Sequence, residues 1–390
     1  MFLDLFFWVS GILLLLIVGY LFFLAFAAMV PGDKLETAMP EKSFLILVPA
    51  HNEASAIGAT LESIRKSEYP ENMLDVVVVA DNCSDNTAEI VKSMGIQCLE
   101  RNDPENTGKG HVLAWVFRHI VDTSGRDAFD AFIILDADTH VAEDFFSVMN
   151  TRLLNGQHVI QAYTQVRHPE RSCLESLAFL GFALNRNLRY LGRTRLGLQA
   201  NLMGTGMCFA RQVIERHGWP ALSRVEDLEM TMYLKLRGVR VFLAEDAHAT
   251  VELHENVHRS GIQRLRWDIG KFQVRNMYLS KFIKRFFQTG DFSFLDSSLE
   301  LVLPPFSLFF ALVMALFAFY LFVDFRQTDM LFYVWTAIIF LLFIYIFLGM
   351  WSAHANFKVY RALLCAPFFV LWRLWIIMAG YVRKYPKTAW

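Results

Sequence analysis

Two aspartates that follow a short apolar run could bind a divalent cation. Asp136 and Asp138 come directly after residues 132–135 and are separated by one residue. Side chains two apart in an extended segment point the same way, so both carboxylates can reach one hard cation. With most ligands left to water and phosphate, that cation suits Mg²⁺ or Mn²⁺ bound to a nucleotide diphosphate. The alternative is a pair of solvated turn residues, which the preceding apolar run disfavours.

Further polar side chains follow two other apolar runs. Pro49 and Glu53 come after residues 44–48, and Asp81 comes after residues 76–80. Carboxylates at strand ends can accept hydrogen bonds from a base edge or from ribose hydroxyls. Such residues can equally cap turns and helices, and each motif alone leaves both interpretations open.

Two glycine-containing segments could approach a phosphate or a sugar. Lys109 lies between two glycines, but Asp103 and His111 stand where a P-loop requires Gly and Ser/Thr. We therefore reject a P-loop and keep Lys109 as a candidate for contacting the nucleotide. Gly204 and Thr205 interrupt an apolar stretch. They permit close approach of the backbone to a ligand, although such glycines are commonly turn residues.

An acidic pair, Glu226 and Asp227, precedes a segment with helical apolar spacing. Acids at a helix start ordinarily reflect a favourable interaction with the helix N-terminus. A carboxylate facing a metal-bound sugar nucleotide could instead act as a general base. The motif alone does not separate these interpretations.

A run of five residues in a basic stretch combines an amide, two guanidiniums and an indole: Gln263, Arg264, Leu265, Arg266 and Trp267. On a helix, Gln263 shares a face with Arg266 and Trp267. Arginine makes bidentate phosphate contacts, and tryptophan offers a flat apolar surface. These side chains could therefore meet a diphosphate and a sugar ring. A membrane-surface helix with interfacial Arg and Trp is the alternative.

Cysteine and histidine patterns give no further site. The five cysteines show no CxxC pair, so we expect reduced thiols and no disulfide. Residues 254–258 match HExxH, but Arg264 occupies the position of a third histidine ligand, and no apolar helix surrounds the pair. A five-residue pattern can match by chance, so these observations disfavour a zinc protease.

The elements that would position these side chains predict an α/β domain. Residues 44–48, 76–80 and 132–135 are short apolar or β-branched runs that lead into polar turns. The spacing of Leu61 and Ile64 predicts an amphipathic helix. This alternation indicates βαβ units on a mostly parallel sheet, whose ligands bind at the carboxyl ends of the strands.

Charge-free segments near both ends of the chain predict membrane helices. Residues 5–32, 301–323 and 330–353 carry no charge, and each is longer than the roughly 20 residues that span a bilayer. We expect an uncleaved N-terminal anchor, because the first run is too long for a signal peptide and lacks a positive start. Residues 362–382 contain a proline and an arginine and could form a span, a re-entrant hairpin or an interfacial helix.

The distribution of charge predicts the orientation. A net charge of −1 gives no general attraction to nucleic acid. Basic residues gather between residues 257 and 287, just before the second charge-free segment. Such clusters favour the cytoplasmic leaflet, so we expect a multi-pass protein of the plasma (inner) membrane with a cytoplasmic catalytic domain. The expected divisions are an anchor (1–32), an α/β domain (33–256), basic amphipathic helices (257–297) and a C-terminal membrane region (298–390).

The order and spacing of these motifs resemble membrane-bound inverting glycosyltransferases of family 2, which have the GT-A fold. Cellulose, chitin and hyaluronan synthases belong to this group, and the motifs are most similar to those of bacterial exopolysaccharide glycosyltransferases. The resemblance covers about residues 44–267. It implies that Asp227 is the base and that the nucleotide and its metal ion are bound by Pro49, Glu53, Asp81, Lys109, Asp136 and Asp138. The leaving group and acceptor would be met by Gly204, Thr205, Glu226, Gln263, Arg264, Arg266 and Trp267.

We therefore expect transfer of a sugar from a UDP-sugar to a growing extracellular polysaccharide. Single addition to a membrane lipid is the alternative, and a nucleotide-sensing membrane protein without activity is a second. The expected partners are a nucleotide sugar, a saccharide or lipid acceptor, the bilayer and accessory export proteins, with no nucleic acid.

Overall fold

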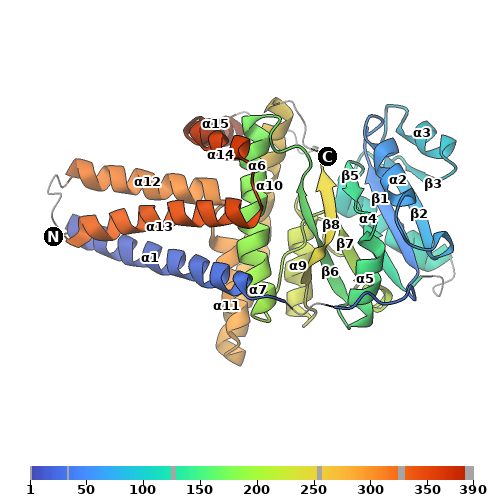
Figure 1. Ribbon diagram of the computed structural model, residues 1–390, viewed down its shortest axis with the longest axis horizontal. Coiled ribbons are helices and arrows are strands. Elements are labelled where there is room, and N and C mark those ends of the chain that lie inside the picture. Colours follow the sequence, from blue (N-terminus) through green and yellow to red (C-terminus); the bar gives the residue numbers. More distant parts are fainter. Residues whose placement is uncertain (1, 33–34, 124–128, 253–256, 324–329, 383–390) are drawn as a thin grey trace. The chain divides into compact units, whose positions relative to one another are not determined.

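The computed structural model describes residues 2–32, 35–123, 129–252, 257–323 and 330–382 (Figure 1). The chain divides into two compact units. One comprises residues 1–32, 168–197 and 302–375, and the other comprises residues 33–167, 198–301 and 376–390.

The second unit is built on an eight-stranded sheet with the order β3-β2-β1-β4-β7-β6-β8-β5. The strands are β1 (Phe44–Ala50), β2 (Leu74–Asp81), β3 (Gln97–Arg101), β4 (Ala131–Ile134), β5 (Thr139–Val141), β6 (Val159–Val166), β7 (Met207–Ala210) and β8 (Phe242–Val251). The three strands expected from the sequence are confirmed as β1, β2 and β4. The mostly parallel sheet is corrected to a mixed one, because β7 runs antiparallel to both β4 and β6, and β5 antiparallel to β8. Apolar runs reveal burial, and they carry no information on strand direction.

In the parallel part of the sheet, the points at which the strands end determine where the polar motifs begin. Strand β1 is buried along its whole length and pairs with β2 and β4. Its pairing with β4 ends at Leu47, whereas its pairing with β2 continues to Ala50. Pro49 therefore lies beyond the end of β4, where its missing N–H removes no bond from that side of the sheet. The residues after Ala50 leave the sheet at its carboxyl edge.

Helices of the same unit surround the sheet (Figure 1). The expected amphipathic helix is confirmed as α2, and the acidic pair begins α9. The helices are α2 (Ile57–Arg65), η1 (Glu71–Met73), α3 (Thr87–Ser93), α4 (Lys109–Thr123), α5 (Phe145–Leu154), α8 (Arg211–His217), α9 (Glu226–Leu236), α10 (Val257–Thr289) and α11 (Phe292–Val302).

The first unit contains the apolar helices. Within the described residues, four helical stretches are long and apolar enough to cross a membrane: Phe2–Met29, Phe306–Val323, Met330–Ser352 and Phe357–Ala379. They comprise α1 (Phe2–Met29), α12 (Phe306–Val323), α13 (Met330–Ser352), α14 (Phe357–Arg361), η3 (Ala362–Cys365) and the greater part of α15 (Ala366–Val382). The second span starts five residues later than its charge-free run, because Pro304 and Pro305 separate α11 from α12.

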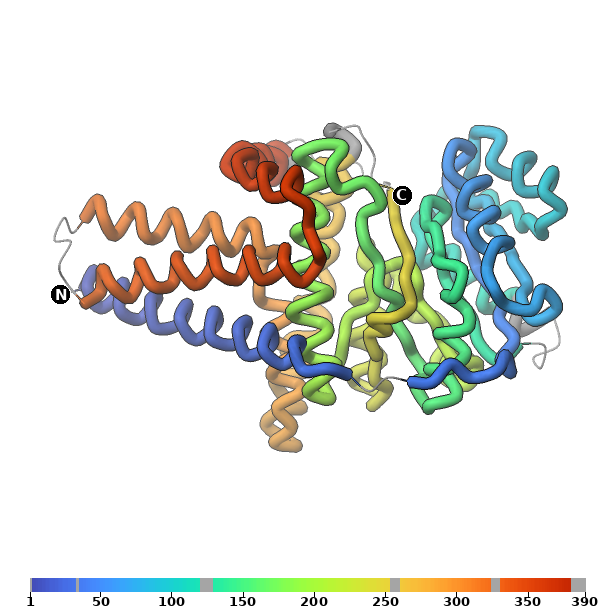
Figure 2. The backbone as a smooth tube through the Cα atoms, viewed as in Figure 1, coloured from blue at the N-terminus to red at the C-terminus, as the bar shows by residue number. Residues whose placement is uncertain are grey.

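A helical segment between β6 and β7 belongs to this unit as well. It consists of α6 (Cys173–Ala183), the π-helix η2 (Leu184–Tyr190) and α7 (Leu191–Arg195). It packs against α1 and α13 and lies across their ends (Figure 2). A disulfide joins Cys173 to Cys365, which corrects the expectation of reduced thiols throughout. The two cysteines are 192 positions apart in the sequence, so their local spacing gives no sign that they meet.

The close packing of α7 on α1 gives a stability prediction. A methyl group on Gly192 would lie 2.1 Å from the carbonyl oxygen of Leu24, whereas one on Gly181 in α6 would meet nothing within 4 Å. Gly192→Ala should therefore destabilise the protein by about 1–3 kcal/mol, because the backbones of α7 and α1 would have to move apart. The control Gly181→Ala should leave stability unchanged or raise it slightly, since alanine favours helix. Thermal unfolding of both variants in detergent measures this, and equal midpoints would contradict the packing described.

Candidate active site

A loop between α7 and β7 forms the centre of the site. Gly204 has a φ of +86°, which favours glycine. A methyl group placed on it would lie 3.6 Å from Asp227 Oδ2, 3.8 Å from Asp136 Oδ2 and 3.8 Å from Lys109 Nζ. Three charged side chains from three distant segments thus face one backbone position.

Buried hydrogen bonds hold this loop to the sheet. The Thr205 hydroxyl accepts a bond from the backbone N–H of Asp136 (2.9 Å) and is 2.7 Å from the Thr139 hydroxyl. The buried Gln161 side chain donates to the carbonyl of Thr205 (2.8 Å) and accepts from the N–H of Met203 (2.7 Å). Because Gln161 lies on β6 and Asp136 follows β4, the loop is fixed between two strands. Sequence analysis missed Gln161, since a lone glutamine in an apolar strand carries no motif.

Lys109 connects the acidic groups. Its ammonium donates to Asp136 Oδ1 and to the carbonyl of Gly204 (2.7 Å), and it lies 3.9 Å from Glu226 Oε1. Burial alone would lower the pKa of Lys109, but Asp136, Glu226 and Asp227 outweigh it, so the pKa is raised. Lys109 therefore stays charged and holds the ends of β4 and α9 together.

Asp138 lies in a crowded acidic environment. Burial, followed by the charges of Asp136 and Glu53, raises the pKa of Asp138 to about 8. Crowded carboxylate oxygens are the ligands that Mg²⁺ and Mn²⁺ prefer, and a cation would remove their mutual repulsion. The residues present therefore fit a divalent cation. No set of three or more His, Cys, Asp or Glu side chains within the described ranges is arranged to hold a metal, so such an ion would need ligands from water and phosphate as well.

The acidic pair at the start of α9 is half-buried. Burial and the neighbouring charge of Asp227 raise the pKa of Glu226 to about 7, and burial raises the pKa of Asp227. Asp227 Oδ1 accepts from the N–H of Leu228 (2.7 Å), which leaves Oδ2 facing Gly204. The pair therefore points into the same space as Asp136.

Two glycines permit this arrangement; Gly110 was considered only as part of a phosphate loop, and Gly270 was not singled out from the sequence. A methyl group on Gly110 would lie 2.6 Å from the carbonyl oxygen of Ala221 and 3.2 Å from Glu226 Cβ, so α4 begins in close contact with the start of α9. A methyl group on Gly270 would lie 2.8 Å from Val225 Cγ1, so α10 packs equally closely there. Lone glycines in helices give no sequence signal of the surface that they approach.

Helix α10 brings residues 263–267 close to the acidic pair. Arg266 is close enough to the acidic pair to lower the pKa of both Glu226 and Asp227 against the effect of burial. Its Nε is buried and has no hydrogen-bond partner among the described residues. Gln263 and Arg264 are half-buried on the same helix, and Trp267 is 38% exposed. The run thus brings a guanidinium to the carboxylates and leaves the indole partly accessible.

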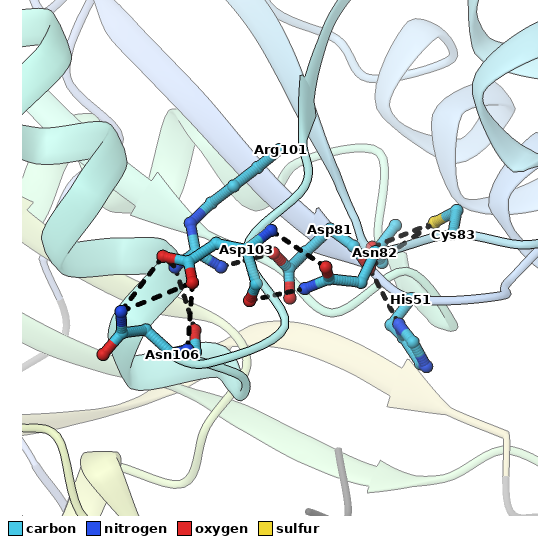
Figure 3. Close-up of polar contacts among 8 residues, drawn as sticks. His51, Asp81, Asn82, Cys83, Arg101, Asp103 and Asn106 are labelled. Atoms are coloured by element: carbon cyan, nitrogen blue, oxygen red, sulfur yellow. Dashed lines mark hydrogen bonds and ion pairs between the residues drawn. The ribbon is translucent and has the colours of Figure 1, made fainter.

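Asp81 lies at the edge of β2 in a separate ion network (Figure 3). It is fully buried, and its Oδ1 accepts from Arg101, which also donates to Asp103 Oδ2 (2.7 Å) and to the carbonyl of Asn106 (2.9 Å). The His51 ring nitrogen Nδ1 is 2.7 Å from the carbonyl oxygen of Asp81. Sequence analysis missed Arg101, because its partner is twenty residues away on a neighbouring strand.

Several sequence-predicted residues are therefore brought together. One space is shared by Asp136, Lys109, Gly204 and Asp227, and Thr205 holds the loop beside it to the sheet. Their charges interact with those of Glu53, Asp138, Glu226 and Arg266. Pro49 and Asp81 lie at the carboxyl ends of β1 and β2. Of the HExxH match, residues 254–256 lie outside the described residues.

Comparisons with known proteins identify the family of this chain. A family model described as glycosyltransferase like family 2 matches residues 40–270. The chain belongs to this family. It is 25% identical to the probable glycosyltransferase YdaM of Bacillus subtilis over 246 residues, which cover 61% of this chain and 57% of that protein. It is 24% identical to the poly-beta-1,6-N-acetyl-D-glucosamine synthase of Staphylococcus aureus over 251 residues, covering 62% and 58%. The chain thus spans less than two thirds of either relative.

A solved structure identifies the fold. The mannosyltransferase PcManGT from Pyrobaculum calidifontis, in complex with GDP-Man and Mn²⁺, superposes with a TM-score of 0.58 at 18% identity. The match covers 89% of this chain and 98% of that one. The sheet with its surrounding helices is therefore a GT-A fold, as expected, with apolar helices at both ends of the chain.

The Asp81–Arg101 pair gives a prediction that does not depend on function. Arg101→Gln should cost about 3 kcal/mol of unfolding free energy, because it leaves a buried carboxylate unpaired. Adding Asp81→Asn should restore part of the loss. Lys92→Gln breaks the exposed Lys92–Glu100 pair and should change little. Thermal unfolding of the full chain compares the three, and an Arg101→Gln variant as stable as Lys92→Gln would refute the pair's importance.

Proposed function

We propose that this chain transfers a sugar from a UDP-sugar to a growing extracellular polysaccharide, with inversion at the anomeric carbon. The observation that carries the proposal is the cluster around Gly204, where Asp136, Asp227 and Lys109 face one position. Such a transfer needs positive charge at a leaving diphosphate and a carboxylate that can deprotonate the acceptor. Both kinds of group are present within this cluster.

The nucleotide side of the site uses the carboxyl ends of the parallel strands. Glu53 and Asp81, with Pro49 at the end of β1, bind the uridine part. Asp136 and Asp138 would hold Mg²⁺ or Mn²⁺ with the diphosphate, and a bound ion would supply positive charge to the leaving group. The Mn²⁺ in the solved mannosyltransferase supports a divalent cation here, and its GDP-Man makes GDP-sugars the second donor class to test.

The acceptor side is formed by the two later motifs. Asp227 takes the proton from the acceptor hydroxyl, while Arg266 donates to the departing diphosphate with its guanidinium. Gly204, Thr205 and Glu226 line the space between them. Gln263 and Arg264 extend this lining along α10, and the partly exposed Trp267 offers a flat surface on which a sugar ring stacks.

The apolar helices support an acceptor that stays at the membrane. The basic segment before α12 favours a cytoplasmic catalytic domain at the plasma membrane. The poly-beta-1,6-N-acetyl-D-glucosamine synthase among the relatives supports a polysaccharide product, with accessory export proteins as further partners. Transfer of a single sugar to a lipid is the second candidate, supported by the same four apolar stretches.

Replacing the base tests the assignment of Asp227. Asp227→Asn should reduce turnover at least about a hundredfold, because general base catalysis contributes about 10²–10⁴ in rate. Binding of UDP-sugar should persist, since the base contacts the acceptor side. The control Glu215→Gln removes an exposed carboxylate on α8 and should leave turnover unchanged. UDP release from purified membranes measures both, and near-normal turnover of Asp227→Asn would exclude it as the base.

Product analysis tests the reaction itself. Membranes containing the full chain are incubated with radiolabelled UDP- and GDP-sugars in turn, and the products are separated by size and by solubility in organic solvent. We expect one UDP-sugar to give a ladder of saccharides. A single lipid-soluble species would establish the lipid alternative, and no labelled product or nucleotide release from any donor would leave only a nucleotide-sensing role.

A further inference from the structure

A buried hydroxyl on α9 joins the helix of the proposed base to the loop at Gly204. Thr231 lies four residues after Asp227 and is 1% exposed. Its hydroxyl donates to the backbone carbonyl of Asp227 (2.8 Å) and accepts from the backbone N–H of Leu202 (3.0 Å). Because Leu202 lies two residues before Gly204, this one oxygen connects the two segments that meet in the site.

Further bonds hold the start of the same loop. The side-chain amide of Gln199 donates to the backbone carbonyl of Thr231 (2.7 Å). The amide of Asn201 donates to Glu300 Oε1 on α11 (3.2 Å). Both amide side chains are buried. The start of the loop is therefore held to α9 and α11, whereas its later residues are held to the sheet.

The bond to Leu202 requires an oxygen on the side chain of residue 231. Threonine hydroxyls in helices commonly donate to the carbonyl four residues earlier, and that bond alone adds little stability. The N–H of Leu202 is different, because this residue is buried and a buried donor that loses its acceptor is costly. Valine has nearly the shape of threonine and lacks the oxygen, whereas serine keeps it. The oxygen can therefore be removed or kept with little change in shape.

The spacing between Asp227 and the loop at Gly204 matters for a general base. Asp227 Oδ1 accepts from the N–H of Leu228, and Oδ2 faces Gly204. In the proposed transfer, the acceptor hydroxyl gives its proton to Asp227 as its oxygen bonds to the anomeric carbon and the bond to the diphosphate breaks. The base must lie within hydrogen-bond reach of that proton. A displacement of about 1 Å can cost about a hundredfold in rate.

We propose that Thr231 is a positioning residue for the transfer. Its hydroxyl sets the spacing between the Asp227 carboxylate and the loop at Gly204, and so directs Oδ2 toward the acceptor. Thr231 acts through backbone groups, namely the carbonyl of Asp227 and the N–H of Leu202. The inference rests on the proposed function and adds to it a buried residue outside the sequence motifs.

Thr151 on α5 provides a matched control. It is 4% exposed, its hydroxyl donates to the carbonyl of Ser147 four residues earlier (2.9 Å), and it accepts from the backbone N–H of Ala38 (3.0 Å). Thr151 thus makes the same two kinds of bond as Thr231, but to the segment that precedes β1. Removing either hydroxyl should lower the unfolding midpoint by a similar amount, whereas only the loss of the Thr231 hydroxyl should affect the reaction.

Steady-state kinetics of the full chain in purified membranes test the proposal. Nucleotide release is measured with the UDP- or GDP-sugar that the wild type turns over fastest, and is normalised to folded protein. Thr231→Val should reduce kcat at least about tenfold and change the KM for the donor less than about threefold, because the base is displaced while the donor site is kept. Thr231→Ser should keep at least about half of the wild-type kcat, since it keeps the oxygen. Thr151→Val should keep the full kcat.

The inference and the proposed function fail in different ways. An active wild type with equal kcat values for Thr231→Val and Thr151→Val, or a Thr231→Ser variant as slow as Thr231→Val, would overturn the inference alone. A wild type that releases no nucleotide from any donor would refute the proposed function and the positioning role with it.

A second variant covers a Thr231→Val chain that does not fold. Gln199→Met removes the other bond from the loop to Thr231 and keeps a side chain of similar length. It should lower kcat at least about threefold, because the loop is then less firmly held against α9. Unchanged turnover of Gln199→Met in that case would overturn the inference.

Discussion

The repulsion among crowded, partly buried carboxylates is the constraint on which the catalytic unit depends. The charges of Asp136 and Glu53 act on Asp138, that of Asp227 acts on Glu226, and Asp136 and Asp227 both face Gly204. Acids this close are unfavourable without compensating cations. Lys109 supplies one cation between the two groups, and Arg266 supplies another from α10. In the proposed reaction, a bound divalent ion and its diphosphate would complete this balance of charge. The arrangement of carboxylates and cations therefore favours binding of the charged groups that the reaction needs.

The fold serves this balance by bringing together segments distant in sequence. Asp136 comes from the end of β4, Lys109 from the start of α4 and Asp227 from the start of α9, and Gly110 and Gly270 allow the helices to approach closely enough. Thr205 and Gln161 then fix the loop that these groups face. Each of these contacts joins residues that are far apart in the sequence. A single motif is therefore weak evidence for function, whereas the set of motifs together is strong evidence.

Sequence analysis predicted the parts with local signals. Apolar runs and polar turns predicted the strands β1, β2 and β4, the helix α2, three charge-free spans and the places of the acidic motifs. The direction of β7, the Arg101 partner of Asp81 and the Cys173–Cys365 disulfide did not follow, because each depends on residues that meet only in the folded chain.

Coupling between nucleotide and metal binding is the most direct test. The dissociation constant of UDP is measured by calorimetry on the full chain in detergent, with and without Mn²⁺, and again for Asp138→Asn. If the carboxylates hold a cation that bridges to the diphosphate, Mn²⁺ tightens UDP binding at least about tenfold, a coupling of about 1.4 kcal/mol, and Asp138→Asn removes the gain. Equal affinity with and without Mn²⁺ in the unaltered chain would contradict a cation-bridged diphosphate at this site.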